Sequence, residues 1–440
     1  MMPLARIAYR NTLKNWRHSL AAIASISAGF LSLVLFQGYI SDVNHLYEVG
    51  FNNRAMYGHL LIENPNVNTP EGKSQPEKNL ISKAEQEKID QFISQHKDKI
   101  ISRVRFLPVT GTVTNGKNSF LFVAMGYDLK EGAMMRAPKW EWEVLYGQPL
   151  QVAQDSDVVV VGQALGFLLG CEPTPKIEGM VQNDGYKPEI RPFQCQKETI
   201  QASAATLSGQ LNAMDFKVVG IIDGGYKDID EKWMKMSVEN AQTLLNTEDV
   251  KFISVLMKKS SQADTFIHDF NQFAEKNGLT TTATHWLKHP VADLFNKTQD
   301  LLGIFQIFIV TVTLTISGLS VLNTVVKSIK ERTREIGALR SLGFSSQQVG
   351  ALFTLEALYL SLMGVGIGFV LAIGITFFVN QSTLLYRAGL LSEPVVFRIA
   401  YDFSSYLFTT VLLSVLAVLT SHFAVKSTVS ATVAANLSNE

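Results

Sequence analysis

Four long apolar stretches alternate with polar segments along the chain. Each stretch is almost free of charged residues and long enough to cross the hydrocarbon core of a bilayer as a helix, which takes about 20 residues. The first stretch is not followed by the small-residue cleavage site of a signal peptide, so we expect it to remain as a membrane helix. The pattern predicts four membrane-spanning helices, at 19–41, 297–326, 349–380 and 403–425.

Residues 42–296, between the first and second of these helices, have the mixed pattern of a water-soluble domain. Asn115-Gly116 separates two runs of alternating apolar residues and predicts a β-hairpin. Ser261 has the sequence context of a residue that begins a helix. Because strands and helices alternate on both sides of a middle stretch, we expect an α/β domain that is split by an insertion near 150–215.

Basic residues are concentrated at the amino terminus and between the second and third predicted helices. They are Arg6, Arg10, Lys14, Arg17, Lys327, Lys330, Arg332, Arg334 and Arg340. Segments rich in Lys and Arg stay in the cytoplasm. We therefore expect residues 1–18, 327–348 and the tail 426–440 to be cytoplasmic, and 42–296 and the short loop 381–402 to be external, in the periplasm.

The four basic residues within 1–18 share one face of a helical wheel. Beside them lies an apolar stripe made of Tyr9, Leu13, Trp16 and Leu20. This arrangement predicts an amphipathic helix at the inner membrane surface, in contact with membrane lipids. An unstructured cationic segment is the alternative interpretation.

The two cysteines of the chain, Cys171 and Cys195, lie in the expected insertion, outside the cytoplasm. An oxidising compartment favours a disulfide between them, and two free thiols are the alternative. Closing a loop of this length would stabilise the insertion by about 3–4 kcal/mol in the chain-entropy model.

The segment that joins the second and third predicted helices has helical periodicity of its own. Residues recur at three- and four-residue steps on one face: Glu335, Ile336, Leu339 and Leu342. Gly343 then has the character of a C-cap, and Ser345 with Gln348 predicts a capping box that opens the next helix. We expect a short charged helix over 329–342 that faces the cytoplasm.

The run ERTREIGALRSLGFSSQQV, followed by Glu356 and by Gly364, Gly366 and Gly368, resembles the FtsX-like permease domain. That domain belongs to membrane subunits of ABC transporters of the lipoprotein-releasing and macrolide-exporter types. The resemblance implies a type VII ABC permease: a polytopic α-helical membrane protein with four transmembrane helices and a large α/β extracytoplasmic domain between helices 1 and 2. Short external motifs match the lipoprotein-releasing permeases more loosely: Gly58–Leu60, Ala124–Asp128, Val160–Gly162 and Phe216–Gly220.

In that family the charged segment is a coupling helix that docks on an ATPase subunit. The resemblance assigns this role to Arg332, Arg334, Glu335, Ile336, Gly337, Leu339 and Arg340. We expect Ile336 and Leu339 to supply the apolar contact with the ATPase, because three-residue spacing places them on one face. Gly337 would allow close approach of the ATPase backbone, and Glu335 would pair with one of its basic residues. Arg332 and Arg334 are expected to meet anionic lipid at the membrane surface.

Two features inside the third predicted helix are candidates for function. Glu356 lies about two turns into the apolar stretch, where a charge is costly and usually functional. It is expected either to pair with an arginine of the coupling helix or a partner subunit, or to reach the interface as a solvated carboxylate. Gly364 and Gly368 form a GxxxG pattern, which allows close helix packing within the chain or in a dimer.

Several kinds of chemistry are not indicated by the sequence. It contains no GxxxxGK[ST] motif, so ATP and magnesium are expected in a separate ATPase chain and no cofactor is expected here. It contains no GxSxG motif, and no catalytic residue is assigned. His285 and His289 lack the glutamate and third ligand of a zinc site, so no metal is expected. A formal net charge of zero gives no reason to expect nucleic acid as a partner.

The resemblance therefore implies a non-catalytic permease subunit in the inner membrane, with its large domain in the periplasm. Its expected partners are an ABC ATPase, a second permease subunit in a homodimer or heterodimer, and a periplasmic carrier or adaptor protein. Lipoprotein release driven by ATP hydrolysis is the first expected function. The alternatives are tripartite export of a peptide, toxin or small molecule, and force transmission to cell-wall hydrolases without transport.

Overall fold

The computed structural model of the protein describes residues 2–14, 19–74, 76–138, 140, 143–174, 191–224, 227–386 and 395–436. Within it the chain forms two compact units. The helical unit comprises residues 1–45, 297–384 and 397–440, and the α/β unit comprises residues 46–296 and 385–396.

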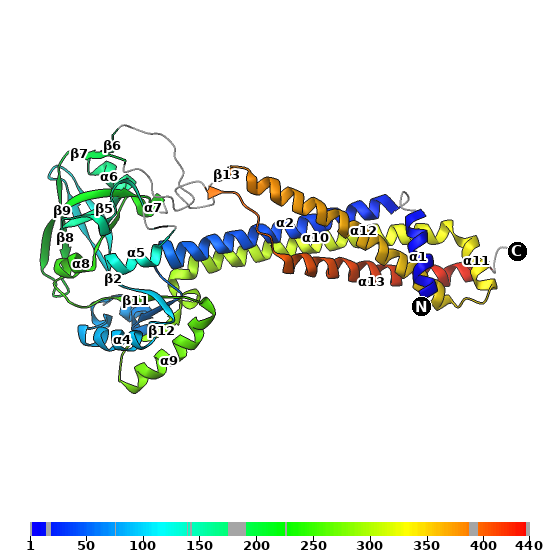
Figure 1. Cartoon of the computed structure of the whole chain (residues 1–440), viewed down its shortest axis with the longest axis horizontal. Helices are drawn as coiled ribbons and strands as arrows, with labels where there is room; N and C mark the ends of the chain where they lie inside the picture. The colour runs from blue at the N-terminus through cyan, green and yellow to red at the C-terminus, as the bar shows by residue number, and fades with distance from the viewer. Residues whose placement is uncertain are drawn as a thin grey trace. The chain divides into compact units, whose positions relative to one another are not determined.

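The helical unit is built from α1 (Met2–Lys14), α2 (Leu20–Val49), α10 (Asp293–Glu331), α11 (Thr333–Ser341), α12 (Ser346–Gln381) and α13 (Phe403–Asn436). Four of these helices, α2, α10, α12 and α13, are long and apolar enough to cross a membrane (Figure 1). Both α2 and α10 extend beyond the apolar spans at 19–41 and 297–326, because the flanking polar segments contain no proline or glycine that would end a helix. The predicted fold class is confirmed.

Small residues bring the helices of this unit close together. An added Cβ on Gly364 would lie 2.9 Å from the Cβ of Ile26, and one on Gly368 would lie 2.9 Å from the carbonyl oxygen of Ser27. Both glycines of the GxxxG pattern therefore pack against α2 of the same chain. On α1, the buried residues that face the unit are Ala8 and Thr12.

The α/β unit is organised around a ten-stranded sheet with the order β12-β1-β11-β2-β3-β10-β5-β9-β4, and β8 pairs with both β2 and β9. The strands are β1 (Leu60–Glu63), β2 (Ile100–Thr114), β3 (Ser119–Tyr127), β4 (Val144–Gly147), β5 (Val158–Gly162), β8 (Thr199–Ala205), β9 (Leu211–Ile222), β10 (Trp233–Ser237), β11 (Phe252–Met257) and β12 (Thr282–His285). Strand β3 pairs in parallel with β10, and β5 with β9, whereas the other described pairs are antiparallel.

Alternation along the strands divides the core of the α/β unit into two layers, one on each face of the sheet. In β5, Val159 and Val161 belong to one buried cluster, whereas Val158 and Val160 belong to the other. The first cluster includes residues from α4 (Lys83–Gln95), α8 (Val238–Leu245) and α9 (Ala263–Lys276). The second includes Met135 of α5 (Leu129–Arg136).

Of two local expectations for the α/β unit, the hairpin is confirmed and the helix start is wrong. Asn115-Gly116 forms the turn of the β2–β3 hairpin, where Thr114 pairs with Ser119. The expected helix start at Ser261 is wrong. A 3-10 turn, Ser260–Gln262, precedes α9, and no side chain caps that helix.

Three strands from the stretch 150–215 belong to the main sheet: β5, β8 and the first residues of β9. The run of valines in β5 is buried on both faces, and this burial places the strand in the sheet interior. In the described part of this stretch, the short ribbon of β6 (Cys171–Pro173) and β7 (Phe193–Cys195) forms a separate two-stranded sheet. A disulfide joins Cys171 and Cys195, which are direct partners across this ribbon.

Candidate coupling site

The segment between α10 and α12 forms a short helix held between two long ones. Helix α10 ends at Glu331, and α11 begins after Arg332, whose φ of −107° and ψ of 23° are not helical. Gly343, with φ of +94°, follows the end of α11 in a conformation that favours glycine. The Ser345 hydroxyl accepts from the Gln348 backbone N–H, and the Gln348 side chain accepts from the Ser345 N–H, so the predicted capping box is confirmed.

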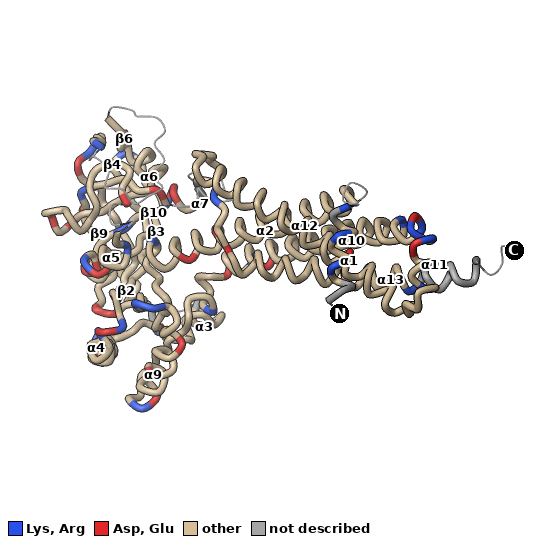
Figure 2. Tube along the Cα trace, turned by 45° about the vertical axis from the view of Figure 1, so that its right-hand side comes forward, with Lys and Arg blue, Asp and Glu red and all other residues tan. Residues whose placement is uncertain are grey.

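Charged residues are scarce along the long helices and gather around α11 (Figure 2). At the centre of this group, Arg332 Nη1 donates to both carboxylate oxygens of Glu356, each at 2.9 Å. Arg332 Nε donates to Glu335 at 2.7 Å, and the guanidinium carbon lies 5.4 Å from the ring centroid of Phe353. One arginine therefore connects the start of α11 with the interior of α12.

This ion pair is largely removed from solvent. The side chains of Arg332 and Glu356 are 14% and 10% exposed, whereas that of Glu335 is 66% exposed. Burial alone would lower the pKa of Arg332, but its hydrogen bonds to Glu356 and Glu335 raise it above the ordinary value. Arg332 therefore stays charged, and the geometry of its contacts favours arginine because lysine lacks the branched set of donors.

A third element joins the pair from the amino terminus. Asn11 Nδ2, on α1, donates to Glu356 Oε1 at 2.8 Å. Tyr9 of the same helix packs edge-to-face on Tyr359, with 5.6 Å between ring centroids. Glu356 thus receives hydrogen bonds from α1 and from the start of α11, and it is not a solvated carboxylate at the interface.

Two expected roles on the coupling helix need correction. Arg332 does not extend to the membrane surface, because it is buried against Glu356. Ile336 packs against the buried core of the helical unit, since the ion pair turns this face of α11 toward α12. Leu342 is instead the exposed apolar residue of the segment, at 77%. No described atom lies within 4 Å of a Cβ added to Gly337, so this position is open within the described part of the chain.

The remaining expected residues lie near this open side of α11. Arg334 and Arg340 are exposed, and Leu339 is half-buried. The exposed surface of the segment therefore combines basic side chains, the Glu335 carboxylate and the apolar Leu342 around Gly337.

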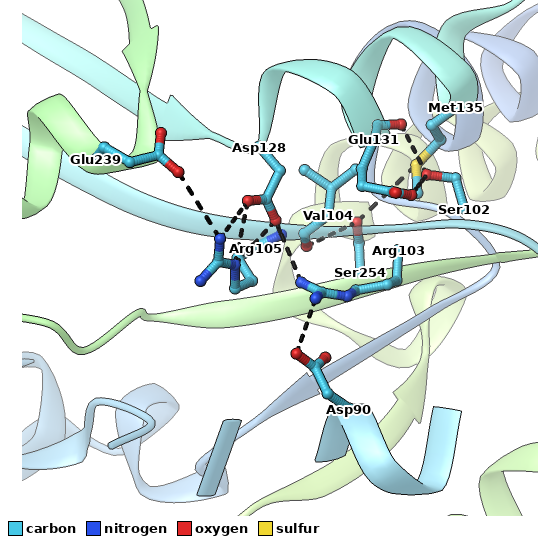
Figure 3. Close-up of polar contacts among 10 residues, drawn as sticks. All are labelled: Asp90, Ser102, Arg103, Val104, Arg105, Asp128, Glu131, Met135, Glu239 and Ser254. Carbon is cyan, nitrogen blue, oxygen red and sulfur yellow. Dashed lines mark hydrogen bonds and ion pairs between the residues drawn. The ribbon is translucent and has the colours of Figure 1, made fainter. Parts of the chain in front are cut away.

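In the α/β unit, a second polar network surrounds Asp128, which follows β3 (Figure 3). Arg105 donates from its backbone N–H, from Nε and from Nη2 to this carboxylate, with distances of 2.6–3.1 Å. Arg103 Nη1 lies 3.4 Å from Asp128 and its Nη2 lies 2.8 Å from Asp90 of α4. Arg105 also lies 3.9 Å from Glu239 of α8. The network connects α4 and α8 to β2 and to the start of α5.

Ser102, also on β2, donates to the backbone carbonyl of Glu131 at 2.7 Å and so attaches α5 to the same strand (Figure 3). Asp128 closes the motif Ala124–Asp128, which resembles lipoprotein-releasing permeases in sequence. Because Asp128 binds two arginines that are separated from it by more than twenty residues, its role depends on strand pairing and could not be predicted from the motif alone.

A buried group of charges lies elsewhere in this unit. Glu143 accepts from Lys235 at 2.7 Å and pairs with Arg136 at 3.2 Å, and the three side chains are 6%, 10% and 0% exposed. Burial would raise the pKa of Glu143, but the two cations together hold that pKa below its ordinary value. Removal of any one of these side chains would leave a buried charge without its partner.

The two histidines considered as metal ligands have structural partners. The ring of His289 is 2.7 Å from Glu63, and His285 accepts from the backbone N–H of Leu287. No arrangement of three or more His, Cys, Asp or Glu side chains suitable for a metal ion occurs in the part of the chain that the structure describes.

Residues 307–433, which include α11, α12 and the ion pair, match the family model described as FtsX-like permease C-terminal. Residues 307–433 thus form an FtsX-like permease C-terminal domain. The chain is 25% identical over 333 residues to the ABC transporter permease YtrF of Bacillus subtilis, with 70% of this chain and 71% of YtrF covered. It is 34% identical over 103 residues to the macrolide export protein MacB of Burkholderia thailandensis, with 22% of this chain and 16% of MacB covered.

Solved structures similar to this chain include the extracellular domain of the transporter YknZ from Gram-positive bacteria. That similarity has a TM-score of 0.31 and 14% identity, and it covers 51% of this chain and 98% of the YknZ chain. The periplasmic region of MacB from Actinobacillus actinomycetemcomitans is similar with a TM-score of 0.32 and 12% identity, covering 55% of this chain and 92% of that one.

Proposed function

We propose that this protein couples ATP hydrolysis by a separate ATPase subunit to movement of its α/β unit. The observation that carries the proposal is the buried Arg332–Glu356 ion pair at the start of an otherwise exposed short helix. A helix that only joined two membrane helices would not need a buried charge pair, which is costly to desolvate.

In this mechanism the ATPase binds the exposed side of α11. Gly337 allows close approach of its backbone, Leu342 supplies an apolar contact, and Glu335 pairs with a basic residue. When ATP binding changes the shape of the ATPase, α11 moves with it. Arg332 transmits this displacement to α12 through Glu356, and Asn11 extends the connection to α1. The displacement is driven only if ATP stabilises one of the two states more than the other.

The proposed assembly contains two permease subunits, identical or homologous, and two ATPase chains that bind ATP and magnesium. The distribution of basic residues supports placing α11 and both termini in the cytoplasm and the α/β unit in the periplasm. The exposed basic side chains of α1 would then lie against inner-membrane lipid.

For the cargo, we propose an acylated lipoprotein released from the inner membrane to a periplasmic carrier. The support is the likeness of the motif that ends in Asp128, and of three other short external motifs, to lipoprotein-releasing permeases. Tripartite export through an adaptor is the second candidate, favoured by the MacB relatives, whose names specify macrolide export. Transfer of labelled lipoprotein from proteoliposomes to carrier distinguishes the two, because an exporter would hydrolyse ATP without releasing lipoprotein.

The coupling role is tested with Gly337→Leu. Since no described atom of the chain lies within 4 Å of a Cβ added here, leucine meets no neighbour among the described residues, and we attribute an effect to the docking of the ATPase. We expect normal membrane levels, weaker co-purification of the ATPase and loss of ATP-dependent activity. Gly374→Leu is the matched control, because Gly374 is also free of neighbours but lies within the apolar span of α12.

A second variant, Glu335→Lys, reverses the charge offered to the ATPase and should weaken docking without affecting insertion. Wild-type activity in both coupling variants at wild-type membrane levels would rule out α11 as the docking helix.

A further inference from the structure

Polar side chains lie at regular intervals where α2 and α10 face each other. Gln306 Nε2 donates to Gln37 Oε1 at 2.7 Å, and Gln299 donates to the side-chain oxygen of Asn44. The two contacts are seven residues apart on both helices. Since a seven-residue step returns to the same face of a helix, both lie on one line between the antiparallel pair.

The same seven-residue series continues along α10 with Thr313 and Ser320. A Cβ added to Gly29 would lie 2.8 Å from Thr313 Cγ2, so the helices approach closely at this point. The hydroxyl of Ser320 donates to the Ala21 carbonyl at 3.4 Å, and that of Ser317 to the Ser25 carbonyl at 3.5 Å. We call these five contacts the polar seam: Asn44–Gln299, Gln37–Gln306, Gly29–Thr313, Ser25–Ser317 and Ala21–Ser320.

The polar seam lies within helices whose other surface is apolar. On α10, the exposed residues next to Gln306 are Phe305, Ile307 and Phe308, at 52–69%. Thr313 lies near the middle of the apolar stretch. Gln306 is seven residues away from Thr313, which corresponds to about 10 Å along the helix axis. It therefore lies within the hydrocarbon, where an unpaired amide is unfavourable.

We propose that the polar seam fixes the register of α2 against α10, so that the two helices move as one rigid pair. Apolar helix surfaces in lipid have little preference for one register over another, because lipid solvates them equally well. Paired amides favour one register over the others, because a slip of one residue along the helix turns the amides toward apolar neighbours. The close contact at Gly29, in the middle of the polar seam, adds a steric constraint.

This inference rests on the proposed function and deepens it. Helix α2 leads into the α/β unit and α10 leads out of it. If the pair cannot slide, a displacement that begins at α11 reaches both chain connections of that unit together. Sliding would instead turn part of the displacement into shear between the two helices.

The test measures register during the ATPase cycle by cysteine cross-linking in native membranes that contain the full complex. The seam pair is Ser25→Cys with Ser317→Cys, which leaves both amide contacts of the polar seam in place. Ser25→Cys with Thr324→Cys reports a shift of one heptad, and Ser25→Cys with Ile316→Cys is the matched control, because Ile316 is 58% exposed. The native cysteines are already joined in a disulfide.

We expect the seam pair to cross-link to within about twofold of the same extent without nucleotide, with ATP and after vanadate trapping, as a fixed register requires. The shifted and control pairs should stay low in every state. A nucleotide-dependent fall in the seam pair with a rise in the shifted pair would overturn the proposal.

A second measurement tests whether the amides hold the register. Gln37→Leu with Gln306→Leu keeps apolar packing but removes the hydrogen bond. We expect ATP-driven activity to fall about 3- to 20-fold at normal membrane levels, the range of an interhelical hydrogen bond in lipid. Ile307→Leu should have no effect. Unchanged activity in the double variant would show that these amides do not hold the register.

These results are separable from a failure of the proposed function. Vanadate-trapped nucleotide in the same membranes reports whether an ATPase is bound and active. If nucleotide is trapped and the register shifts, only the polar seam proposal fails. If no ATPase is bound, the coupling proposal fails, and cross-linking of the seam pair without nucleotide still reports whether the register is fixed.

Discussion

Neutralising Glu356 should detach α11 from α12. In Glu356→Gln the side chain keeps its shape, but Arg332 loses the charge that compensates its burial. Breaking a buried ion pair costs about 3–5 kcal/mol. Here the cost is smaller, because Arg332 keeps its hydrogen bond to the exposed Glu335 and can extend its side chain toward water. We expect a cost of about 1–2 kcal/mol, which makes the open state of α11 about 5- to 30-fold more populated.

Hydrogen exchange of the α11 backbone amides in the intact complex measures this opening directly. Exchange over residues 333–341 should accelerate by the same factor in Glu356→Gln. The control is Glu331→Gln, since Glu331 pairs with Lys327 at 3.8 Å on the surface, and such pairs contribute at most about 1 kcal/mol. Equal exchange in the two variants would refute the view that Glu356 holds α11 in place.

Three further predictions concern the α/β unit. Asp128→Asn should lower the free energy of unfolding by about 2–3 kcal/mol, the contribution of charged hydrogen bonds, and so lower the thermal midpoint of the full chain. Asp98→Asn, at an exposed site, should leave the midpoint unchanged. Equal midpoints for the two variants would argue against the Asp128 network. Because the pKa of Glu143 is lowered on folding, its stabilising contribution is present above the ordinary carboxyl pKa and is lost as the pH falls through the lowered one. Glu143→Gln should therefore reduce stability at pH 7 and weaken its dependence on pH in the acid range, and an unchanged acid profile would contradict this. Under non-reducing conditions Cys171 and Cys195 should resist alkylation. Cys171→Ser should destabilise the ribbon of β6 and β7 by about 3–4 kcal/mol. Two alkylated thiols in native protein would exclude the disulfide.

The membrane helices and the local turns were predictable because their signals lie within short windows. Apolar length identifies the long helices, and Asn115-Gly116 or Ser345 with Gln348 specifies a turn or a cap through neighbouring atoms. The composition of 150–215 does not reveal the buried strand β5, because loops rich in polar residues surround it.

Contacts between segments that are distant in the sequence were harder to predict. Glu356 was recognisable as a costly charge, and an arginine of the coupling helix was one of its expected partners. Asn11 was not predictable, since its contact depends on how α1 packs against α12. The polar positions at 299, 306, 313 and 320 have a visible heptad spacing, but their partners on α2 depend on helix register. The Glu143 trio combines residues that only the sheet brings together.

The central claim is that ATP moves the α/β unit through α11. It is tested most directly by distance measurements between spin labels on the two units, at Leu211→Cys and Leu384→Cys, which are 80% and 58% exposed in the unmodified chain. The reconstituted complex should show a different distance distribution after vanadate trapping, and Gly337→Leu should abolish that difference. A distribution that stays the same while the wild-type complex hydrolyses ATP, or a full shift in Gly337→Leu, would contradict the account.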